Sequence, residues 1–204
     1  MEQKKYLKWY HKVGYGSGDV AGNCVYALLT AFMMIYLTDT VGLSLGIVST
    51  LIAVSKIFDG VSDFFFGRMI DKTHTKMGKY RPWILTGAVM NAIVLGLLFN
   101  NPGFASGSTG LYVYAAVLYV LWGMTNTLAD IPFWSMVPLF ASEEKDRNLV
   151  STIARAFSGL GQGIISIFTP MAVAFFGGVA GSKLDAMTPD ALRTGFGKWS
   201  LVTS

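Results

Sequence analysis

Five long apolar stretches run along this chain, separated by short polar segments, and a sixth begins at its end. Treated as helices, they cover about residues 13–37, 44–70, 82–99, 111–140 and 149–176, with a stub at 199–204. A helix of about 17 to 25 apolar residues crosses the hydrocarbon core of a bilayer. The pattern therefore predicts an all-α integral membrane protein with several spans.

Two details of this pattern predict local structure. Pro132 and Pro138 interrupt the fourth run near its end, which predicts a kink there. Between the fifth run and the stub, residues 177–198 are polar, and Thr188 followed by Pro189 has the form of a cap and first turn. We expect a short surface helix in that segment, separate from the apolar run that starts at Trp199.

Composition agrees with a membrane location. Hydrophobic residues make up 52% of the chain and charged residues only 14%, whereas soluble domains have about 25% charged residues. The pI of about 9.1 is compatible with nucleic-acid binding, but the lysines and arginines lie in short segments between the apolar runs. Membrane lipid is therefore the expected surrounding, and no nucleic-acid partner is expected.

The distribution of basic residues predicts the orientation. The N-terminal tail carries Lys4, Lys5, Lys8 and Lys12, the segment after the second run carries Arg68, Lys72, Lys76, Lys79 and Arg81, and the loop after the fourth adds Lys145 and Arg147. The loops after the first and third runs carry no lysine or arginine. By the positive-inside rule the N-terminus is cytoplasmic and the protein lies in a plasma membrane, which in bacteria is the inner membrane.

The second apolar run contains one cation and two carboxylates, at Lys56, Asp59 and Asp63. An ionised group near the bilayer centre costs about 2.5 to 3.5 kcal/mol on insertion scales, so these groups need partners. Asp59 and Asp63 differ by about 40° around a helix axis and share one face. With Ser62 adjacent, the arrangement suits a bare cation, and Lys56 would balance the charge of the empty site. The alternative is a buried ion-pair network that only joins helices.

Further charges lie in the other spans, at Asp19, Asp130 and Arg155. They can be satisfied only by meeting in a shared polar interior, where Asn126 and Thr127 precede Asp130 by one turn. Trp134 follows Asp130 by one turn and offers an apolar plate beside a carboxylate, which is what a sugar ring requires. The alternative for Trp134 is a place in an interfacial belt or in the core.

An intramembrane aspartyl hydrolase that uses Asp59 and Asp63 is an enzyme hypothesis for the same residues. Carboxylate pairs that catalyse hydrolysis face each other from separate segments, whereas these two lie one turn apart on one helix. The geometry therefore argues against a hydrolase.

A third hypothesis is a membrane sensor or partner subunit that is derived from a transporter and does not itself transport.

Three segments resemble the glycoside-pentoside-hexuronide:cation symporters of the major facilitator superfamily, the family of the melibiose permease. They are KIFDGVSD at 56–63, MGKYRPWI at 77–84 and WGMTNTLADIPFWSMVP at 122–138. The resemblance extends along the chain in collinear order. It implies the N-terminal half of a twelve-helix sugar:cation symporter that works by alternating access, with the C-terminal half missing here. It implies no enzyme activity, and no cofactor or metal other than a coupling ion, Na⁺ or H⁺.

The resemblance also assigns roles to residues. It implies a cation site at Asp59, Asp63 and Thr127, with Ser62 beside it, and sugar-binding positions at Asp19, Tyr26, Asn126, Asp130, Trp134 and Arg155. A cytoplasmic gating loop is implied at Gly67, Asp71, Lys72, Lys79 and Arg81. The chain departs from the melibiose permease at three positions, two of them among these residues and one directly before Asp19. Gly18 replaces a lysine, Asn126 replaces a tyrosine, and Ser62 replaces an asparagine.

Overall fold

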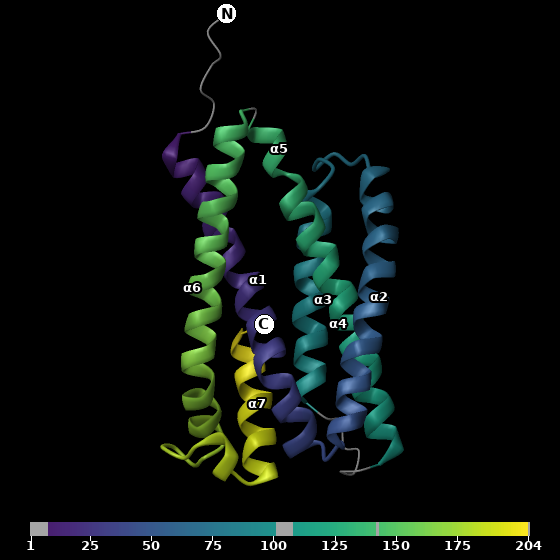
Figure 1. Ribbon diagram of the computed structural model, residues 1–204, viewed down its shortest axis with the longest axis vertical. Coiled ribbons are helices and arrows are strands. Elements are labelled where there is room, and N and C mark those ends of the chain that lie inside the picture. The colour runs from purple at the N-terminus through teal and green to yellow at the C-terminus, as the bar shows by residue number, and fades with distance from the viewer. Residues whose placement is uncertain (1–7, 101–107, 142, 204) are drawn as a thin grey trace, which may run out of the picture.

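The structure is a computed structural model that describes residues 8–100, 108–141 and 143–203 (Figure 1). The described residues form helices and turns without a β-strand. The elements are α1 (Trp9–Ile35), a π-helical turn η1 (Tyr36–Thr40), α2 (Leu45–Asp71), α3 (Arg81–Phe99), α4 (Thr109–Ser135), α5 (Val137–Phe140), α6 (Glu144–Phe176), a 3₁₀ turn η2 (Leu184–Ala186) and α7 (Pro189–Thr203).

Five of these helical segments are long and apolar enough to cross a membrane. They cover Trp9–Thr40, Leu45–Asp71, Arg81–Phe99, Thr109–Leu139 and Glu144–Phe176. The prediction of an all-α, multi-pass integral membrane protein is thus confirmed. Parts of the predicted pattern lie outside the described residues: Lys4 and Lys5 of the basic tail, most of the uncharged loop at 100–110, and the terminal Ser204.

The structure confirms the predicted break near the end of the fourth span and differs from the sequence pattern at the start of the fifth. The fourth span is interrupted at Met136, between α4 and α5, because Pro138 has no N–H to donate to the preceding turn. The fifth begins earlier than its apolar run, at Glu144, because acidic residues are favourable in the first turn of a helix.

The segment before Trp199 differs most. Instead of a surface helix followed by a separate stub, one helix, α7, continues from Pro189 to Thr203. Thr188 caps it by accepting a hydrogen bond from the N–H of Ala191, at 3.4 Å. Leu192 and Phe196 are fully buried on its inner face, so the polar residues that suggested a surface segment occupy only one side of α7.

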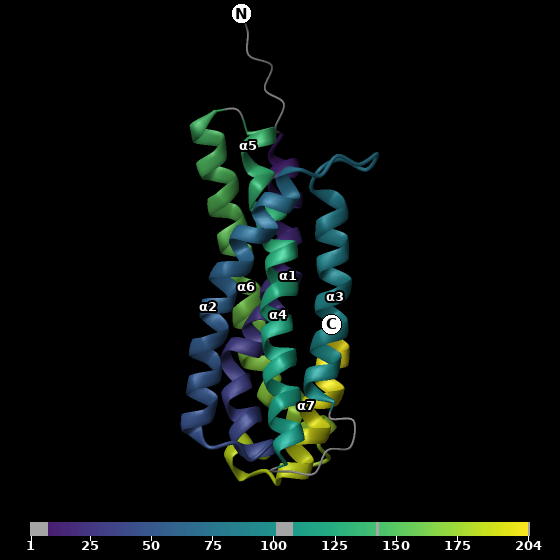
Figure 2. The ribbon, with the colours of Figure 1, turned by 90° about the vertical axis from the view of Figure 1, so that its right-hand side faces the viewer.

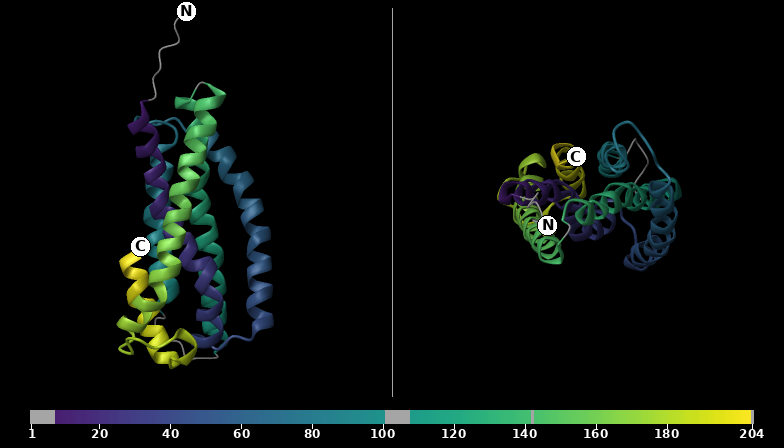
Figure 3. Two further views of the ribbon diagram at one scale, coloured as in Figure 1. Left: turned by 60° about the vertical axis from the view of Figure 1, so that its left-hand side comes forward. Right: turned by 90° about the horizontal axis from the view of Figure 1, so that it is seen from above.

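The helices pack with α4 near the centre. Figure 2 shows α4 between α2 and α3, and α7 packs against α6 and α3 (Figure 3). At the end of the bundle opposite the N-terminus, the rings of Tyr36, Phe99 and Phe196 lie 4.7 to 5.8 Å apart, centroid to centroid. This aromatic cluster joins η1, α3 and α7.

Close helix approaches depend on two glycines. A Cβ placed on Gly87 of α3 would lie 2.7 Å from the backbone nitrogen of Ala129 in α4. A Cβ on Gly161 of α6 would lie 2.9 Å from the carbonyl oxygen of Val20 and 3.3 Å from the sulfur of Cys24, both in α1. The α1–α6 and α3–α4 pairs therefore have backbones in near contact, as small residues permit between membrane helices.

We expect Gly161→Ala to lower the free energy of unfolding by about 1 to 3 kcal/mol, because the methyl group overlaps α1 backbone that cannot move aside. Gly163→Ala is the matched control on the same helix, since a Cβ there meets no atom within 4 Å. Thermal unfolding of the purified chain in detergent measures both. Equal midpoints for the two variants would show that α1 and α6 do not pack this closely.

Candidate functional site

A cavity of about 400 Å³ lies between α2 and α4. Its wall includes Lys56, Asp59 and Asp63 from α2, and Asn126, Thr127 and Asp130 from α4. The structure therefore brings together most of the residues that the sequence assigned to a cation site. We call this space the ion cavity.

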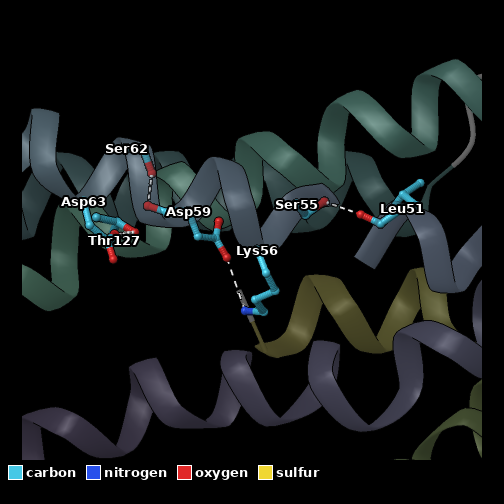
Figure 4. Close-up of polar contacts among 7 residues, drawn as sticks. All are labelled: Leu51, Ser55, Lys56, Asp59, Ser62, Asp63 and Thr127. Carbon is cyan, nitrogen blue, oxygen red and sulfur yellow. Dashed lines mark hydrogen bonds and ion pairs between the residues drawn. The ribbon is translucent and has the colours of Figure 1, made fainter. Parts of the chain in front are cut away.

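The two α2 carboxylates have different partners in the ion cavity (Figure 4). Asp63 Oδ1 accepts a hydrogen bond from Thr127 Oγ1 at 2.9 Å, which links α2 to α4. Asp59 Oδ2 lies 3.2 Å from the ammonium nitrogen of Lys56. The side chain of Lys56 is 55% exposed, so packing does not hold its ammonium in place.

The second carboxylate oxygen of Asp59 is packed against α4. Asp59 Oδ1 is buried and has no hydrogen-bond partner among the described residues. It lies against Gly123, where an added Cβ would overlap it. The Asp59 carboxylate therefore fits against α4 only because position 123 has no side chain.

Ser62 is turned onto its own helix. Its hydroxyl donates to the backbone carbonyl of Asp59 at 2.9 Å (Figure 4), and it is not among the residues that line the ion cavity. The hydroxyl of Ser55, two helical turns earlier, likewise donates to the backbone carbonyl of Leu51, at 2.8 Å. A direct role for Ser62 as a cation ligand stays a prediction.

A second cavity, of about 390 Å³, lies between α1, α3 and α4. Asp19, Asn23, Tyr26, Asn126, Asp130 and Phe133 contribute to its wall. Tyr26, Asn126 and Asp130 line both this space and the ion cavity. The two cavities are therefore separated by shared side chains, and we call the second one the α1–α4 cavity.

Asp19 is buried, at 7% exposure, and belongs to a polar network between α1 and α6. The hydroxyl of Ser158 donates to Asp19 Oδ2. The amide of Asn23 donates to Ser158 Oγ at 3.1 Å, and Gln162 donates to Asn23 Oδ1 at 3.0 Å. Sequence reasoning did not find Ser158, because a lone serine in an apolar helix carries no signal of its partner; its spacing of four from Gln162 was the available clue.

Asp130, Trp134 and Arg155 form a third group. The indole N–H of Trp134 donates to Asp130 Oδ1 at 3.1 Å, and the guanidinium carbon of Arg155 lies 5.4 Å from the centre of the Trp134 ring. Trp134 and Arg155 do not line either of the two cavities described above. The expected neighbourhood of carboxylate and indole is present, and the sugar-binding role of these residues stays a prediction.

A further residue that the sequence did not reveal joins α1 to the end of α4. The hydroxyl of Tyr15 donates to the backbone carbonyl of Phe133 at 2.5 Å, and the two rings stack at 4.4 Å between centroids. This contact holds the end of α4 that carries Asp130 and Trp134, close to where Pro138 interrupts the helix.

The loop between α2 and α3 is held by polar contacts at its base. Lys79 Nζ lies 2.8 Å from Asp71 Oδ1 and Trp83 Nε1 donates to Thr73 Oγ1 at 3.0 Å. The hydrogen bond to Asp71 raises the pKa of Lys79. Among the other predicted gating residues, Arg81 begins α3, Lys72 caps α2, and a Cβ on Gly67 would meet no atom.

A bundle of membrane-spanning helices with carboxylates gathered around internal cavities is a multi-pass membrane protein with a polar interior. Residues 14–195 match the family model described as MFS/sugar transport protein, so the chain belongs to that family. The resemblance to glycoside:cation symporters is confirmed at the level of the family.

Named relatives include carriers for several sugars. The chain is 34% identical over 175 residues to the isoprimeverose transporter of Lactiplantibacillus pentosus, covering 86% of this chain and 36% of the relative. It is 30% identical over 197 residues to the raffinose carrier protein of Pediococcus pentosaceus, at 91% and 31% coverage. For the glucuronide carrier protein homolog of Escherichia coli (strain K12), the identity is 28% over 197 residues, at 96% and 40% coverage. The chain thus spans well under half the length of these relatives.

We expect Gly123→Ala to displace the Asp59 carboxylate from its place against α4, because the methyl group and Oδ1 cannot occupy the same space. A hydrophobic carbodiimide should then label Asp59 several times faster, as measured by mass spectrometry of the modified peptide. Gly60→Ala is the control, since Gly60 lines the same cavity but its Cβ would meet no atom within 4 Å. Unchanged labelling in Gly123→Ala would contradict the close contact.

Proposed function

We propose that this chain is the N-terminal half of a secondary active symporter that couples uptake of a sugar or glycoside to a proton or a sodium ion by alternating access. The observation that carries the proposal is the pair of cavities with a shared wall of Tyr26, Asn126 and Asp130. Two ligands that contact the same side chains change each other's affinity, and this reciprocity is what a symporter requires. The carrier names of the relatives support this assignment.

The coupling ion is proposed to bind in the ion cavity. Asp59, Asp63 and Thr127 line this cavity, and carboxylate and hydroxyl oxygens are suitable ligands for a small hard cation. Lys56 balances Asp59 when the cavity holds no ion, since its ammonium lies 3.2 Å from that carboxylate. An ion that enters then replaces an internal counter-charge, so the span never carries two unbalanced carboxylates.

The sugar is proposed to bind on the other side of the shared wall, toward the α1–α4 cavity and the Trp134 ring. Asp130 lies on both cavities and already aligns the indole of Trp134 through their hydrogen bond. A carboxylate accepts two hydroxyl groups at once, while the indole face packs on the C–H face of a pyranose. Asp19, Tyr26, Asn126 and Arg155 complete the proposed set of sugar-binding side chains.

The proposed assembly places the N-terminus in the cytoplasm of a bacterial cell, with the protein in the inner membrane. A C-terminal half of the same fold is the proposed partner, because alternating access moves one half of such a carrier against the other. The loop from Asp71 to Arg81 then lies on the cytoplasmic side, where its Lys79–Asp71 contact can open and close with the transport cycle.

We expect Asp130→Asn, and likewise Asp19→Asn, to abolish sugar binding while cation binding survives, because an amide cannot accept two hydroxyl groups as a carboxylate does. Calorimetry on the full-length carrier with raffinose and isoprimeverose, and with sodium alone, measures the two affinities. Asp39→Asn is the control, since Asp39 pairs with Thr38 at the far end of α1. Unchanged sugar affinity in Asp130→Asn would exclude the assigned site.

We also expect protons to drive the carrier and sodium to be the weaker coupling ion. A proton needs one carboxylate, whereas sodium needs several oxygens, and the Ser62 hydroxyl is engaged with the Asp59 carbonyl. Ser62→Asn, with a longer side chain, should strengthen sodium dependence. Uptake into vesicles under a pH gradient or a sodium gradient measures this.

Ser55→Asn is the matched control for that change, because Ser55 also donates to a carbonyl of its own helix but lines a different cavity, with Leu51 and Tyr112. A wild-type carrier that follows the sodium gradient and ignores the pH gradient would refute the serine argument. Asp59, Asp63 and Thr127 would then be a sufficient sodium site.

A further inference from the structure

Asp19 of α1 uses its two carboxylate oxygens differently. Oδ2 accepts a hydrogen bond from the hydroxyl of Ser158 in α6. Oδ1 has no hydrogen-bond partner among the described residues, yet it is not one of the buried oxygens that lack a partner, so it remains open to water. Because Asp19 is otherwise buried and lines the α1–α4 cavity, Oδ1 is the oxygen that it offers to a ligand there.

The Ser158 hydroxyl has one proton and two acceptors within reach, Asp19 Oδ2 and the backbone carbonyl of Ala154 at 3.0 Å. The carboxylate is the stronger acceptor of the two. The amide of Asn23 donates to Ser158 Oγ at 3.1 Å, which occupies a lone pair of the hydroxyl and helps to fix its direction. The proton of Ser158 therefore points to Asp19.

Asn23 is itself held by hydrogen bonds on both sides of its amide. Its second N–H donates to the backbone carbonyl of Asp19 at 2.9 Å, and its Oδ1 accepts from Gln162 at 3.0 Å. Gln162, Asn23 and Ser158 thus donate in one direction along a chain that ends on the Asp19 carboxylate, and hydrogen bonds in such a chain strengthen one another. The orientation of this carboxylate is therefore fixed by side chains of α1 and α6 before any ligand binds.

Asp130, in the wall of the same cavity, repeats the arrangement. The indole N–H of Trp134 donates to Asp130 Oδ1 at 3.1 Å. Asp130 Oδ2 has no partner within the described part of the chain, and it too is absent from the buried oxygens that lack one. The α1–α4 cavity therefore presents two carboxylates, each with one oxygen held by a donor of the protein and the other open.

We propose that Ser158, oriented by Asn23, is a positioning residue for sugar binding: it holds Asp19 Oδ2 so that Oδ1 accepts a hydroxyl group of the bound sugar. The inference rests on the proposed function, because it takes Asp19 as a sugar-binding carboxylate. Without this donor the carboxylate turns about its Cβ–Cγ bond, and fixing it on binding lowers the affinity for the ligand. Asp19 thus accepts two hydroxyl groups, one from the protein and one from the sugar.

The test uses the full-length carrier with raffinose and isoprimeverose as ligands, and calorimetry measures the affinities. We expect Ser158→Ala to bind them about tenfold more weakly, because a hydrogen bond to a charged group no longer fixes Asp19. Ser158→Thr keeps the hydroxyl and should bind as wild type does, and Asn23→Ala, which frees the direction of that hydroxyl, should lie between. Ser166→Ala is the matched control, since Ser166 is exposed on the same helix, two turns beyond Ser158.

A second measurement separates positioning from a bond that only joins α1 to α6. A carbodiimide labels Asp19, as mass spectrometry of the modified peptide shows, and bound sugar should shield Asp19 in wild type and in Ser158→Thr. In Ser158→Ala, sugar at a saturating concentration should shield it much less, because the sugar no longer meets a fixed Oδ1. A merely structural bond would lower the midpoint of thermal unfolding and leave this protection unchanged.

Wild-type affinity and full protection in Ser158→Ala would overturn the inference and leave the proposed sugar site standing. An equal loss of affinity in Ser158→Thr would overturn it too, because the hydroxyl would then not be the cause. If Ser158→Ala does not fold, Asn23→Ala decides: an unchanged affinity overturns the inference, and a lower one supports it. If Asp19→Asn binds sugar as wild type does, or if wild type binds neither sugar, the proposed sugar site fails and the positioning role fails with it.

Discussion

The constraint on which this structure depends is that a carboxylate inside a membrane-spanning helix must have a donor or a counter-charge close by. Three carboxylates meet it with side chains of the spans. Asp63 takes a hydroxyl from Thr127 of α4, Asp19 takes a hydroxyl from Ser158 of α6, and Asp130 takes the indole N–H of Trp134. Two of these bonds join helices that are distant in sequence, so the charges help to decide which helices become neighbours.

The same constraint places the cavities. A polar side chain that faced lipid would lose its partners, so the polar faces of α1, α2 and α4 turn toward one another and leave a space between them. Asn126 and Asp130 lie on α4 between the two spaces and line both. In the proposed symporter, coupling between the two ligands would need no long pathway, because these side chains line both spaces.

Sequence reasoning predicted the features that depend on local periodicity. The spans follow from apolar run length, and the common face of Asp59 and Asp63 follows from their spacing of four. Lys56 contacts Asp59, as two residues three apart on one helix can. Partners across helices were not predictable, because nothing near Ser158 or Tyr15 in the sequence tells which helix each will face. The full length of α7 was not predictable for the same reason. The sequence does not tell that Phe196 is buried, because the residues that cover it belong to α3 and η1.

In the proposed symporter, the supply of oxygen atoms connects the fold to the choice of coupling ion. Serine and threonine in a helix can donate to a carbonyl one turn back, and Ser55 and Ser62 both do so, which removes their hydroxyls from the cavity side. Thr127 donates to Asp63 instead, because that carboxylate is a stronger acceptor than a carbonyl already bonded within its helix. Which hydroxyls remain available to an ion is therefore decided by competition with the helix backbone. A site with few remaining oxygens suits a proton better than sodium, which needs several oxygen ligands.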